Sequence, residues 1–447
     1  MILLGFDKRA KGESNRAAVM SKTATSHPTP PSWWVLFHCF GLIGLLSFGG
    51  PAAQIALMHH ELVDRRNWLS EEQFLRGLSF CMLLPGPEAM QLATYTGWRM
   101  RGIGGGLLAG SLFILPGAFV ISILVWLYVA FGTLPAVQSA FLGIKAAVVV
   151  IVVQALWRIS RKALKSTGAW LLALTGFVAI FALNLPFPVV VLGAGIIGLF
   201  QSAETANTPP PVQPVAPNHW RVIVLWSTLW LLPLLGLSLI GADFLATIGW
   251  FFAKLAVVTF GGAYAVLAYM TQTVVSEHGW ITTGQMIDAL GLAETTPGPL
   301  VLVTQFVAML AGAEVGGAML ALAAGAVALW ATFTPCFLWI FATAPFVERL
   351  THQPRLRGAL QAITAAVAGM MLNLSVWFLL HLLFQKQTSV MLGPVTLPAP
   401  DVQSLNVPSL VLVALAPIVA LVLRGRILWL LAAMASLGLI AAGFTVG

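Results

Sequence analysis

The chain has 447 residues, of which 59% are hydrophobic and 9% are charged, and its formal net charge is +8. Soluble globular proteins carry about 25% charged residues, so this composition excludes a water-soluble fold and makes lipid the solvent. Long apolar stretches without two-residue alternation exclude a transmembrane β-barrel. The basic residues stand in short loops between apolar stretches, which argues against nucleic acid as a partner.

The predicted elements, in chain order, start with a basic tail over 1–32, which we expect to be a cytoplasmic tail rather than a signal peptide. Uninterrupted apolar stretches then predict membrane-spanning helices. These cover 103–131, 135–157, 168–184, 187–201, 221–241, 316–345, 357–384, 407–423 and 427–446. A Pro-rich linker over 202–220 and a polar external loop over 385–406 separate some of these helices.

Four further apolar segments are each broken in the middle by a glycine or proline motif; they are 33–60, 72–98, 245–272 and 284–310. Glycine and proline at such a break remove helical hydrogen bonds. Backbone of this kind survives at membrane depth only where protein or a cavity satisfies it. The four segments are therefore predicted to be either kinked spanning helices or re-entrant hairpins.

The second half of the chain repeats the first at a shift of 212 positions, which becomes 219 after a small insertion. Phe48-Gly49-Gly50 falls on Phe260-Gly261-Gly262, and Pro85-Gly86-Pro87 falls on Pro297-Gly298-Pro299. A duplicated apolar chain with matched breaks is typical of a secondary transporter. The expected division is a tail over 1–32, a first repeat over 33–201, a linker with an inverting helix over 202–242, and a second repeat over 243–447.

Basic loops in one half correspond to neutral or less basic loops in the other. Arg65-Arg66, for example, falls on Glu277-His278. Because cytoplasmic loops carry the excess of Lys and Arg, we expect the two halves to face opposite ways, with the N-terminus in the cytoplasm. The predicted fold is an all-α polytopic membrane protein with two inverted-topology repeats, whose broken or re-entrant helices meet near the membrane midplane.

Helices that start after the breaks would present unpaired backbone amides and the positive end of the helix dipole. Two inverted copies would bring these helix starts together and form a site for a small anion. The alternative is that glycine and proline only allow helices to cross closely. The candidate substrate-binding residues are Ser47, Gly49, Gly50, Gln54, Pro85, Gly86, Pro87, Gln91, Lys145, Thr259, Gly261, Gly262, Thr296, Pro297, Gly298 and Pro299.

Ionisable side chains inside apolar segments are costly and often functional. Glu88 and Glu294 lie beside the Pro-Gly-Pro motifs and are the candidate coupling residues, since a protonated carboxyl group admits an anion that a carboxylate repels. Lys145, within a predicted span, is a candidate to face the anion; for all three, the alternative is a structural ion pair. Lys254 is expected to snorkel to the external surface. The residues expected to border a cytoplasmic vestibule, or only to anchor the topology, are Arg76, Arg99 and Arg101.

The motifs together resemble the chromate ion transporter family in its long, two-domain form. The residues that carry the resemblance are Phe48-Gly49-Gly50-Pro51 with Gln54, Trp68-Leu69, Leu84-Pro85-Gly86-Pro87, Gln91 to Gly97, Phe260-Gly261-Gly262, Trp280-Ile281 and Thr296-Pro297-Gly298-Pro299. The resemblance implies efflux of chromate across the bacterial inner membrane, driven by the proton gradient or the membrane potential, and chromate resistance. Leu300 and Val303 stand where the first half has Glu88 and Gln91, so the site is not expected to be symmetric.

Several alternatives stay open. Sulfate or another oxyanion could be the substrate, because it shares the shape of chromate, and a passive anion channel could use the same half-helices. An intramembrane enzyme would need an acid–base cluster at one membrane face, and the sequence contains no hydrolase, phosphate-loop or metal-ligand pattern. Its three cysteines lie far apart in apolar stretches. We therefore expect a transporter rather than an enzyme, without a cofactor or metal.

Overall fold

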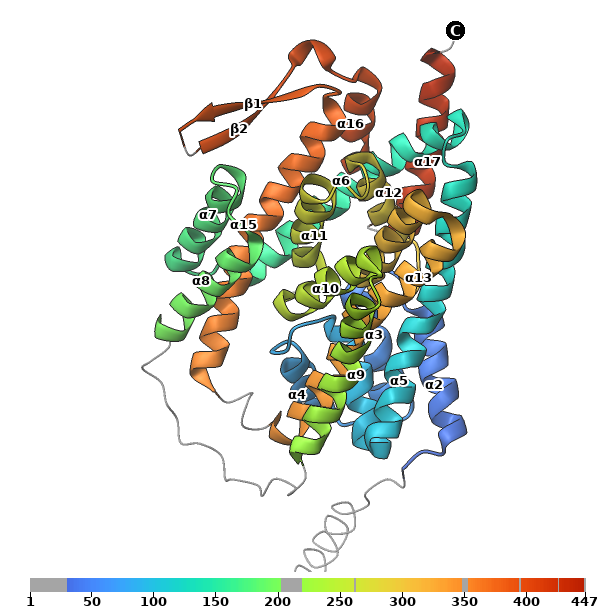
Figure 1. Cartoon of the computed structure of the whole chain (residues 1–447), viewed down its shortest axis with the longest axis vertical. Helices are drawn as coiled ribbons and strands as arrows, with labels where there is room; N and C mark the ends of the chain where they lie inside the picture. Colours follow the sequence, from blue (N-terminus) through green and yellow to red (C-terminus); the bar gives the residue numbers. More distant parts are fainter. Residues whose placement is uncertain are drawn as a thin grey trace, which may run out of the picture.

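The computed structural model describes residues 30–201, 219–260, 263–347, 353–393, 395–424 and 426–445, and over these residues the chain is mostly helical (Figure 1). Most of the predicted tail and linker lies outside the described residues. Among the described helices, those long and apolar enough to cross a membrane are Glu88–Phe131, Pro135–Ala163, His219–Leu239, Leu300–Phe346 and Pro354–Leu383. Large apolar side chains such as Phe119, Trp126 and Trp157 are exposed on the outer faces of two of these helices. The protein is therefore a helical membrane protein.

The described elements follow the same order in both halves. The first half contains α2 (Trp33–Leu46), α3 (Gly50–His59), the π-helix η1 (His60–Arg65), α4 (Glu71–Cys81), α5 (Glu88–Phe131), α6 (Pro135–Ala163), α7 (Thr167–Phe181) and α8 (Phe187–Gln201). After α9 (His219–Leu239), the second half contains α10 (Asp243–Val258), α11 (Ala263–Thr271), the π-helix η2 (Gln272–Glu277), α12 (Thr283–Glu294), the 3-10 turn η3 (Leu300–Leu302), α13 (Val303–Thr343), the 3-10 turn η4 (Ala344–Phe346), α15 (Pro354–Leu383), α16 (Val407–Val422) and α17 (Ile427–Thr445).

The two longest helices, α5 and α13, each fold back on themselves. In α5 the backbone leaves helical geometry at Arg101 and Gly102, and Gly102 has a φ of +62°. In α13 it does so at Gly316 and Gly317, where Gly317 has a φ of +73°. A left-handed backbone of this kind favours glycine. The predicted spans 103–131 and 316–345 therefore begin at these turns, and the arms before them belong to the broken segments.

The region over 385–406 differs from the predicted polar loop. It contains an antiparallel hairpin of β1 (Gln387–Leu392) and β2 (Val395–Pro400), followed by the 3-10 turn η5 (Val402–Ser404). The turn between the strands includes Gly393, whose φ is +64°. The prediction of an all-α fold was therefore wrong for this segment. Strands of only six residues in a polar region give too short an alternation of apolar and polar residues to be recognised in the sequence.

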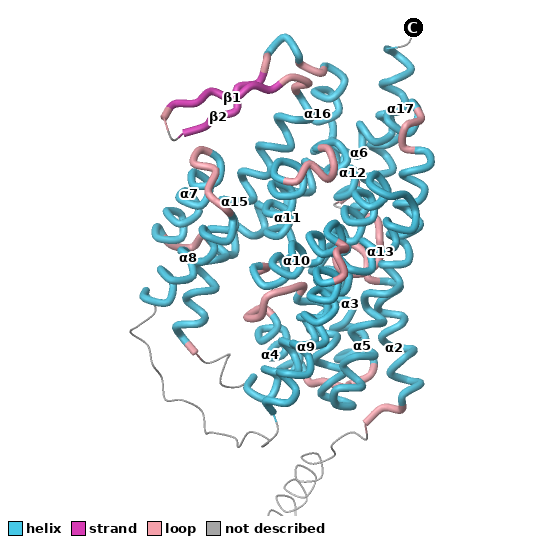
Figure 2. Tube along the Cα trace, viewed as in Figure 1, coloured by secondary structure: helices cyan, strands magenta, loops and turns pink. Residues whose placement is uncertain are grey.

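The last helices of each half pack against the other half. Helices α7 and α8 lie beside α15, and α16 and α17 lie beside α6 (Figure 1). Small residues allow this close approach, since a Cβ atom added to Gly143 of α6 or to Gly369 of α15 would overlap the backbone of the other half. Helices α5 and α13 also pack together, with α2 against α5 and α10 against α13. In Figure 2, loops interrupt the helices inside the molecule as well as at its ends.

Candidate functional site

The helix breaks of the two halves are joined to each other by backbone hydrogen bonds. The amide of Gly86, in the first Pro-Gly-Pro motif, donates to the carbonyl oxygen of Thr259 at 2.9 Å. The amide of Gly298, in the second such motif, donates to the carbonyl oxygen of Ser47, also at 2.9 Å. Each Pro-Gly-Pro turn is therefore held by the residue that ends the first helix of the opposite half. The structure thus brings the described parts of the four breaks together.

Ser47 and Thr259 end α2 and α10, and their hydroxyl groups are already engaged. Each hydroxyl donates to the carbonyl of the residue four positions earlier, Ile43 and Leu255 respectively. Bonds of this type use the side-chain proton within the helix itself. These hydroxyl groups can accept a hydrogen bond in this conformation, but their protons are not directed at an anion.

Glycine is required at the breaks by backbone geometry. Gly49 and Gly50 have φ values of +87° and +78°, and Gly86 and Gly298 have values of +121° and +89°. A Cβ atom on Gly86 would also lie 2.8 Å from Nε2 of Gln91 and 2.9 Å from Sγ of Cys336. The predicted candidates Gly261 and Gly262 lie outside the described residues.

Two helices start at the breaks without a side-chain cap. Helix α3 begins at Gly50 and α5 begins at Glu88, and neither Gly49 nor Pro87 offers a side-chain acceptor to the first turn. First-turn amides have no acceptor within their own helix. They therefore provide donors, together with the positive end of the helix dipole, for an anion. Pro299 likewise precedes the turn that leads into α13, and Thr296 donates its hydroxyl to Ala293.

Two buried glutamines lie at the crossing of the breaks, by which we mean the point where the bonds Gly86–Thr259 and Gly298–Ser47 join the two halves. Gln54 donates from Nε2 to the carbonyl of Gly298 at 2.6 Å and to that of Ser47 at 3.3 Å. Gln91 donates from Nε2 to the carbonyl of Pro85 at 2.6 Å. The Oε1 atoms of both glutamines are buried and have no hydrogen-bond partner. The crossing therefore contains free acceptors, which suit a water molecule or the hydroxyl of a protonated oxyanion.

The candidate charged residues lie in different surroundings. Glu88 is the half-buried first residue of α5, whereas Glu294 is buried at the end of α12. Lys145 contacts Asp288 of α12, with Nζ and Oδ2 3.4 Å apart, and Tyr128 donates its hydroxyl to the same oxygen at 2.9 Å. Asp288 is not among the residues predicted from the sequence, although an acid within one of the broken apolar segments is a signal that could have identified it.

The three arginines predicted to border a vestibule have separate contacts. Arg76 pairs with Glu72 one turn earlier. Arg101 donates to the backbone carbonyls of Pro31 and Pro30, and its guanidinium lies 5.3 Å from the ring centroid of Trp33. Arg99 is exposed. These contacts hold Arg101 to the residues before α2.

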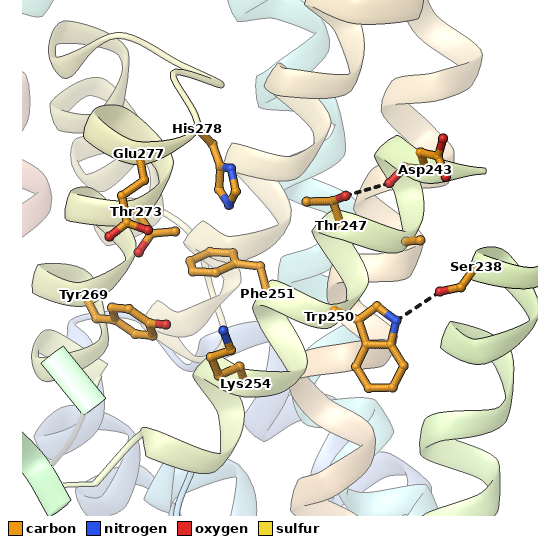
Figure 3. Close-up of a pocket in the computed structure, with 11 residues that line it drawn as sticks. Ser238, Asp243, Thr247, Trp250, Phe251, Lys254, Tyr269, Thr273, Glu277 and His278 are labelled. Atoms are coloured by element: carbon orange, nitrogen blue, oxygen red, sulfur yellow. Dashed lines mark hydrogen bonds between the residues drawn. The ribbon is translucent and has the colours of Figure 1, made fainter. Parts of the chain in front are cut away.

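A cavity of about 670 Å³ lies between α10 and the α11–η2 segment. In Figure 3, Lys254 and Tyr269 extend toward the space beside Phe251, with His278 above it. Thr273, which also lines the cavity, is buried, and its hydroxyl has no hydrogen-bond partner. Lys254 precedes Thr259 by five residues, or about 7.5 Å along the helix axis. Lys254, whose side chain is exposed, is thus the lining residue nearest in sequence to this break.

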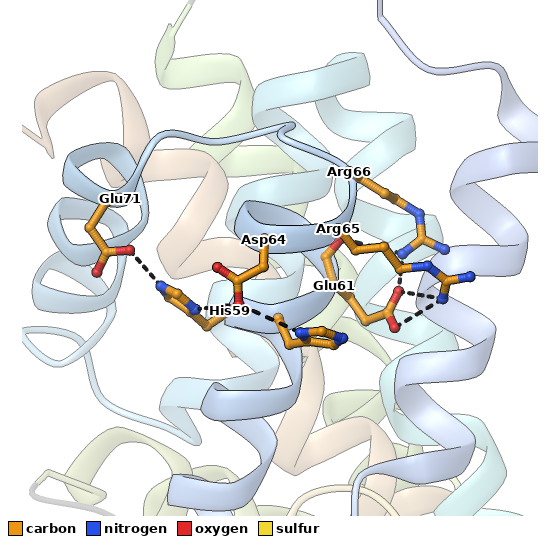
Figure 4. A network of polar contacts seen from close by, with 7 residues as sticks. His59, Glu61, Asp64, Arg65, Arg66 and Glu71 are labelled. Carbon is orange, nitrogen blue, oxygen red and sulfur yellow. Dashed lines mark hydrogen bonds and ion pairs between the residues drawn. The ribbon is translucent and has the colours of Figure 1, made fainter.

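The equivalent region of the first half holds a network of charged side chains (Figure 4). Glu61 is buried and pairs with Arg66 and Arg65, while His59 pairs with Glu71. Burial acts to raise the pKa of Glu61, but hydrogen bonds and charges from the two arginines outweigh it and hold the pKa below its ordinary value. The network and part of the cavity lining occupy matching positions on the π-helices η1 and η2, which were not among the elements predicted from the sequence.

Among the described residues, no group of His, Cys, Asp and Glu side chains could hold a metal ion. What the arrangement offers instead is a buried crossing of four chain breaks with backbone amides, amide oxygens and nearby charged groups. Such a crossing can bind a small anion that has left most of its water behind.

Comparison with known proteins identifies the family. The family model described as chromate transporter matches residues 34–199 and 246–439. The chromate transport protein of Pseudomonas aeruginosa is 32% identical over 368 residues, which cover 81% of this chain and 85% of that protein. The chromate transport protein of Cupriavidus metallidurans is 31% identical over 349 residues, covering 77% of this chain and 83% of that protein. No solved structure matches the chain.

A shorter relative matches part of the chain. The uncharacterized transporter YwrA of Bacillus subtilis is 32% identical over 151 residues, which cover 32% of this chain and 85% of that protein. The two segments matched by the family model fall in the two halves of the chain and together make up most of it. The chain belongs to the chromate transporter family, and it is a multi-pass membrane transporter rather than an enzyme.

Proposed function

We propose that this protein is a secondary active transporter that exports chromate across the bacterial inner membrane, driven by the membrane potential or the proton gradient, and so confers chromate resistance. The observation that carries this proposal is the pair of reciprocal hydrogen bonds, Gly86 to Thr259 and Gly298 to Ser47. They make one site from matched breaks in two halves, which is the arrangement that secondary transporters use for a substrate.

The proposed architecture is a pair of inverted repeats, 33–201 and 243–447, with α9 as the inverting helix. Its support in the sequence is that basic loops of one half match neutral or less basic loops of the other. The broken segments also contain short helices, since α3, α4, α11 and α12 have 10, 11, 9 and 12 residues. At 1.5 Å per residue none exceeds about 18 Å, so none of these helices crosses the ~30 Å hydrocarbon core alone. Re-entrant segments are favoured because the arms on either side of the breaks in α5 and α13 fold onto each other, with Gly97 close to Gly105 and Gly312 close to Leu320.

The proposed substrate site is the crossing of the breaks. First-turn amides of α3 and α5 would donate to the oxygens of the anion. The free Oε1 atoms of Gln54 and Gln91 would accept from a water molecule or from the hydroxyl of a protonated anion. Glu88 and Glu294, which lie beside the two Pro-Gly-Pro motifs in the chain, are proposed to adjust the charge of the crossing by taking up protons.

Alternating access is supported by a difference between the two halves. In the first half, the matching positions hold the ionic network of Glu61 with Arg65 and Arg66. In the second half, the matching region is a cavity lined by Thr273, Glu277 and His278. We infer that the cavity is the open approach to the site and that the network closes the other approach.

Counterflow in proteoliposomes tests this function against a passive channel. Vesicles with the full chain are loaded with unlabelled chromate and diluted into a trace of labelled chromate, with the membrane potential held at zero by valinomycin and equal potassium. A carrier takes up the label transiently above its external concentration, because each exit of unlabelled chromate turns the binding site to the outside, where it binds labelled chromate and carries it in. A channel brings the label only to equal concentrations on both sides. Counterflow with sulfate in place of internal chromate tests the alternative, a transporter for sulfate and other oxyanions. Overshoot of labelled chromate driven by internal sulfate would support that alternative. Equilibration without overshoot would contradict the carrier mechanism.

A further inference from the structure

An acid–base pair that does not belong to the crossing of the breaks joins α12 to α6. Asp288 of α12 lies opposite Lys145 of α6, and Gly284 and Gly291 lie about one turn to either side of it. A Cβ atom on Gly284 would lie 3.3 Å from the Nζ atom of Lys145, and one on Gly291 would overlap Ile144. The glycines therefore allow the two helices to approach and bring the charges together.

The carboxylate of Asp288 is buried and unevenly paired. Its side chain is 5% exposed and that of Lys145 is 21% exposed. Both partners, Lys145 and Tyr128, contact the same oxygen, Oδ2, whereas Oδ1 is buried without any hydrogen-bond partner. A buried carboxylate oxygen without a donor is unfavourable, and a proton on that oxygen would remove the negative charge that holds Lys145.

Few other ionisable groups face this pair. Tyr128 reaches it from α5, and Glu314 of α13 accepts a hydrogen bond from Gln285, which lies one turn before Asp288 on α12. Helix α12 itself ends at Glu294. In α15, His381 contacts the carbonyl and the ring of Trp377. The elements α17 and η3 contain no charged residue in their described parts.

The positions related to this pair by the repeat do not hold an acid and a base. At the repeat shifts, Asp288 corresponds to Arg76 and Lys145 corresponds to Thr364. Helix α12 packs against α13, as its counterpart α4 packs against α5, but α12 also packs closely against α6, and over the described residues α4 has no similarly close packing against α15. A structural contact needed by both repeats would be expected in both, so an asymmetric ion pair between two packed helices points to a role in the transport cycle.

We propose that Asp288 is a proton-binding group. Its carboxylate pairs with the ammonium group of Lys145 when the carrier is empty, and the transported oxyanion takes the place of that carboxylate beside Lys145. The carboxylate of Asp288 takes up one proton as it leaves Lys145, and Lys145 keeps its proton and its charge throughout. The oxyanion then binds to the released ammonium group on its path through the crossing of the breaks, and both the proton and the oxyanion leave together on the other side. This inference rests on the proposed transport function and assigns to Asp288 the proton that crosses with each anion, whereas the protons on Glu88 and Glu294 only set the charge of the crossing.

This scheme is compatible with potential-driven export. A dianion that moves with one proton carries one negative charge, which a membrane potential that is negative inside drives outward. The pH gradient acts through the accompanying proton, so an acidic external side opposes export. The scheme therefore makes a prediction about the direction of the pH effect as well as about its existence.

The test uses proteoliposomes of the full chain with the membrane potential held at zero by valinomycin and equal potassium. With an imposed pH gradient, wild-type protein should accumulate labelled chromate on the alkaline side, by up to about tenfold per pH unit. D288N should carry chromate to equal concentrations without accumulation. The double variant K145Q/D288N removes both charges, so no buried ammonium is left unpaired, and it should show slower transport that is also insensitive to pH. The control D401N, in the loop after the hairpin, should behave like wild type.

The outcomes separate this inference from the proposed function. Accumulation by D288N equal to that of wild type would overturn the role of Asp288. Wild-type transport that ignores the pH gradient would also overturn it, while chromate transport itself would stand. A folded wild-type protein that moves no chromate would contradict the proposed function. If D288N does not fold, the double variant decides the question through the final ratio of chromate concentrations on the two sides of the membrane. This ratio does not depend on how fast the variant transports chromate.

Discussion

Gly86 and Thr259, which lie in different halves of the chain, are joined by a 2.9 Å backbone hydrogen bond. Its counterpart joins Gly298 to Ser47 at the same distance. Because each Pro-Gly-Pro turn is held by the opposite half, neither half could keep its break in this geometry alone. The two bonds therefore explain why a single chain with two repeats can form one site.

Substitution of the turn glycines should impair transport. In G86A the new Cβ atom meets Gln91 and Cys336, and the residue must keep a φ of +121°. Strain of this kind costs about 1–3 kcal/mol and shifts the amide that bonds Thr259. We expect a loss of chromate flux and a lower unfolding temperature in detergent. G236A, in open space on α9, is the matched control and should keep both. Equal flux in G86A and G236A would show that the turn is not needed.

Gln54 should contribute to both the site and stability. It donates to the carbonyls of Gly298 and Ser47, and the equivalent position in the second half is Val266. Q54V copies that residue and leaves a buried carbonyl without its donor, which costs about 1–3 kcal/mol. Chromate flux and denaturant unfolding of Q54V measure the effect. Unchanged flux with unchanged stability would remove Gln54 from the site.

The Glu61 network should stabilise the protein in a pH-dependent way. Because the pKa of Glu61 is lowered in the folded protein, its contribution is complete above about pH 4.3, the ordinary value, and is lost as pH falls through the folded value. At neutral pH, E61Q should lose about 1–3 kcal/mol, since Arg66 and Arg65 lose a charged partner. Unfolding measured from pH 7 downward should show the difference shrink at low pH. A difference that grows on acidification would contradict this assignment.

The membrane orientation can be tested by labelling single cysteines from each side of the membrane. With inverted repeats, positions 158–165 and 348–357 should both be accessible from the cytoplasm, because both are basic. Cysteines at Arg161 and Arg355, placed in a variant without the three native cysteines, serve this test. Labelling of the two positions from opposite sides would show that the halves are not inverted as proposed.

The candidate coupling residues make a separate prediction. E88Q and E294Q remove the acids beside the two Pro-Gly-Pro motifs, and K145A removes the cation that Asp288 holds. We expect each to lower chromate flux, and K145A to lower it most, because it removes the positive charge proposed to bind the anion. Unchanged flux in both E88Q and K145A would contradict the site assignment and leave the family membership unaffected.

Local features were the part of the fold most open to prediction. Gly49, Gly50 and Gly86 occur in motifs that interrupt apolar segments, and the structure has positive φ values at each. The starts of α4 and α12 also follow from local chemistry, since Ser70 with Gln73 and Thr282 with Gln285 form capping boxes at matching positions. These features depend on neighbours in the chain, which is why a sequence reveals them.

Contacts between distant segments could not be predicted in the same way. Lys145 and Asp288 are far apart in the chain, and they meet because α6 packs against helices of the second half. The bonds between opposite breaks likewise depend on helices of one half packing against helices of the other. The hydroxyl groups of Ser47 and Thr259 looked like donors for an anion, yet each bonds within its own helix. The choice between these partners is made by tertiary packing, which the repeat pattern does not specify.

The most direct test of the account is uptake of labelled chromate into everted vesicles that contain the full chain. We predict accumulation when the vesicle lumen is positive, no accumulation when the potential is collapsed, and persistence of uptake in excess sulfate. Uptake abolished by sulfate would instead indicate a broader oxyanion carrier. No uptake in vesicles shown to contain the folded protein would contradict the central claim that this chain transports chromate.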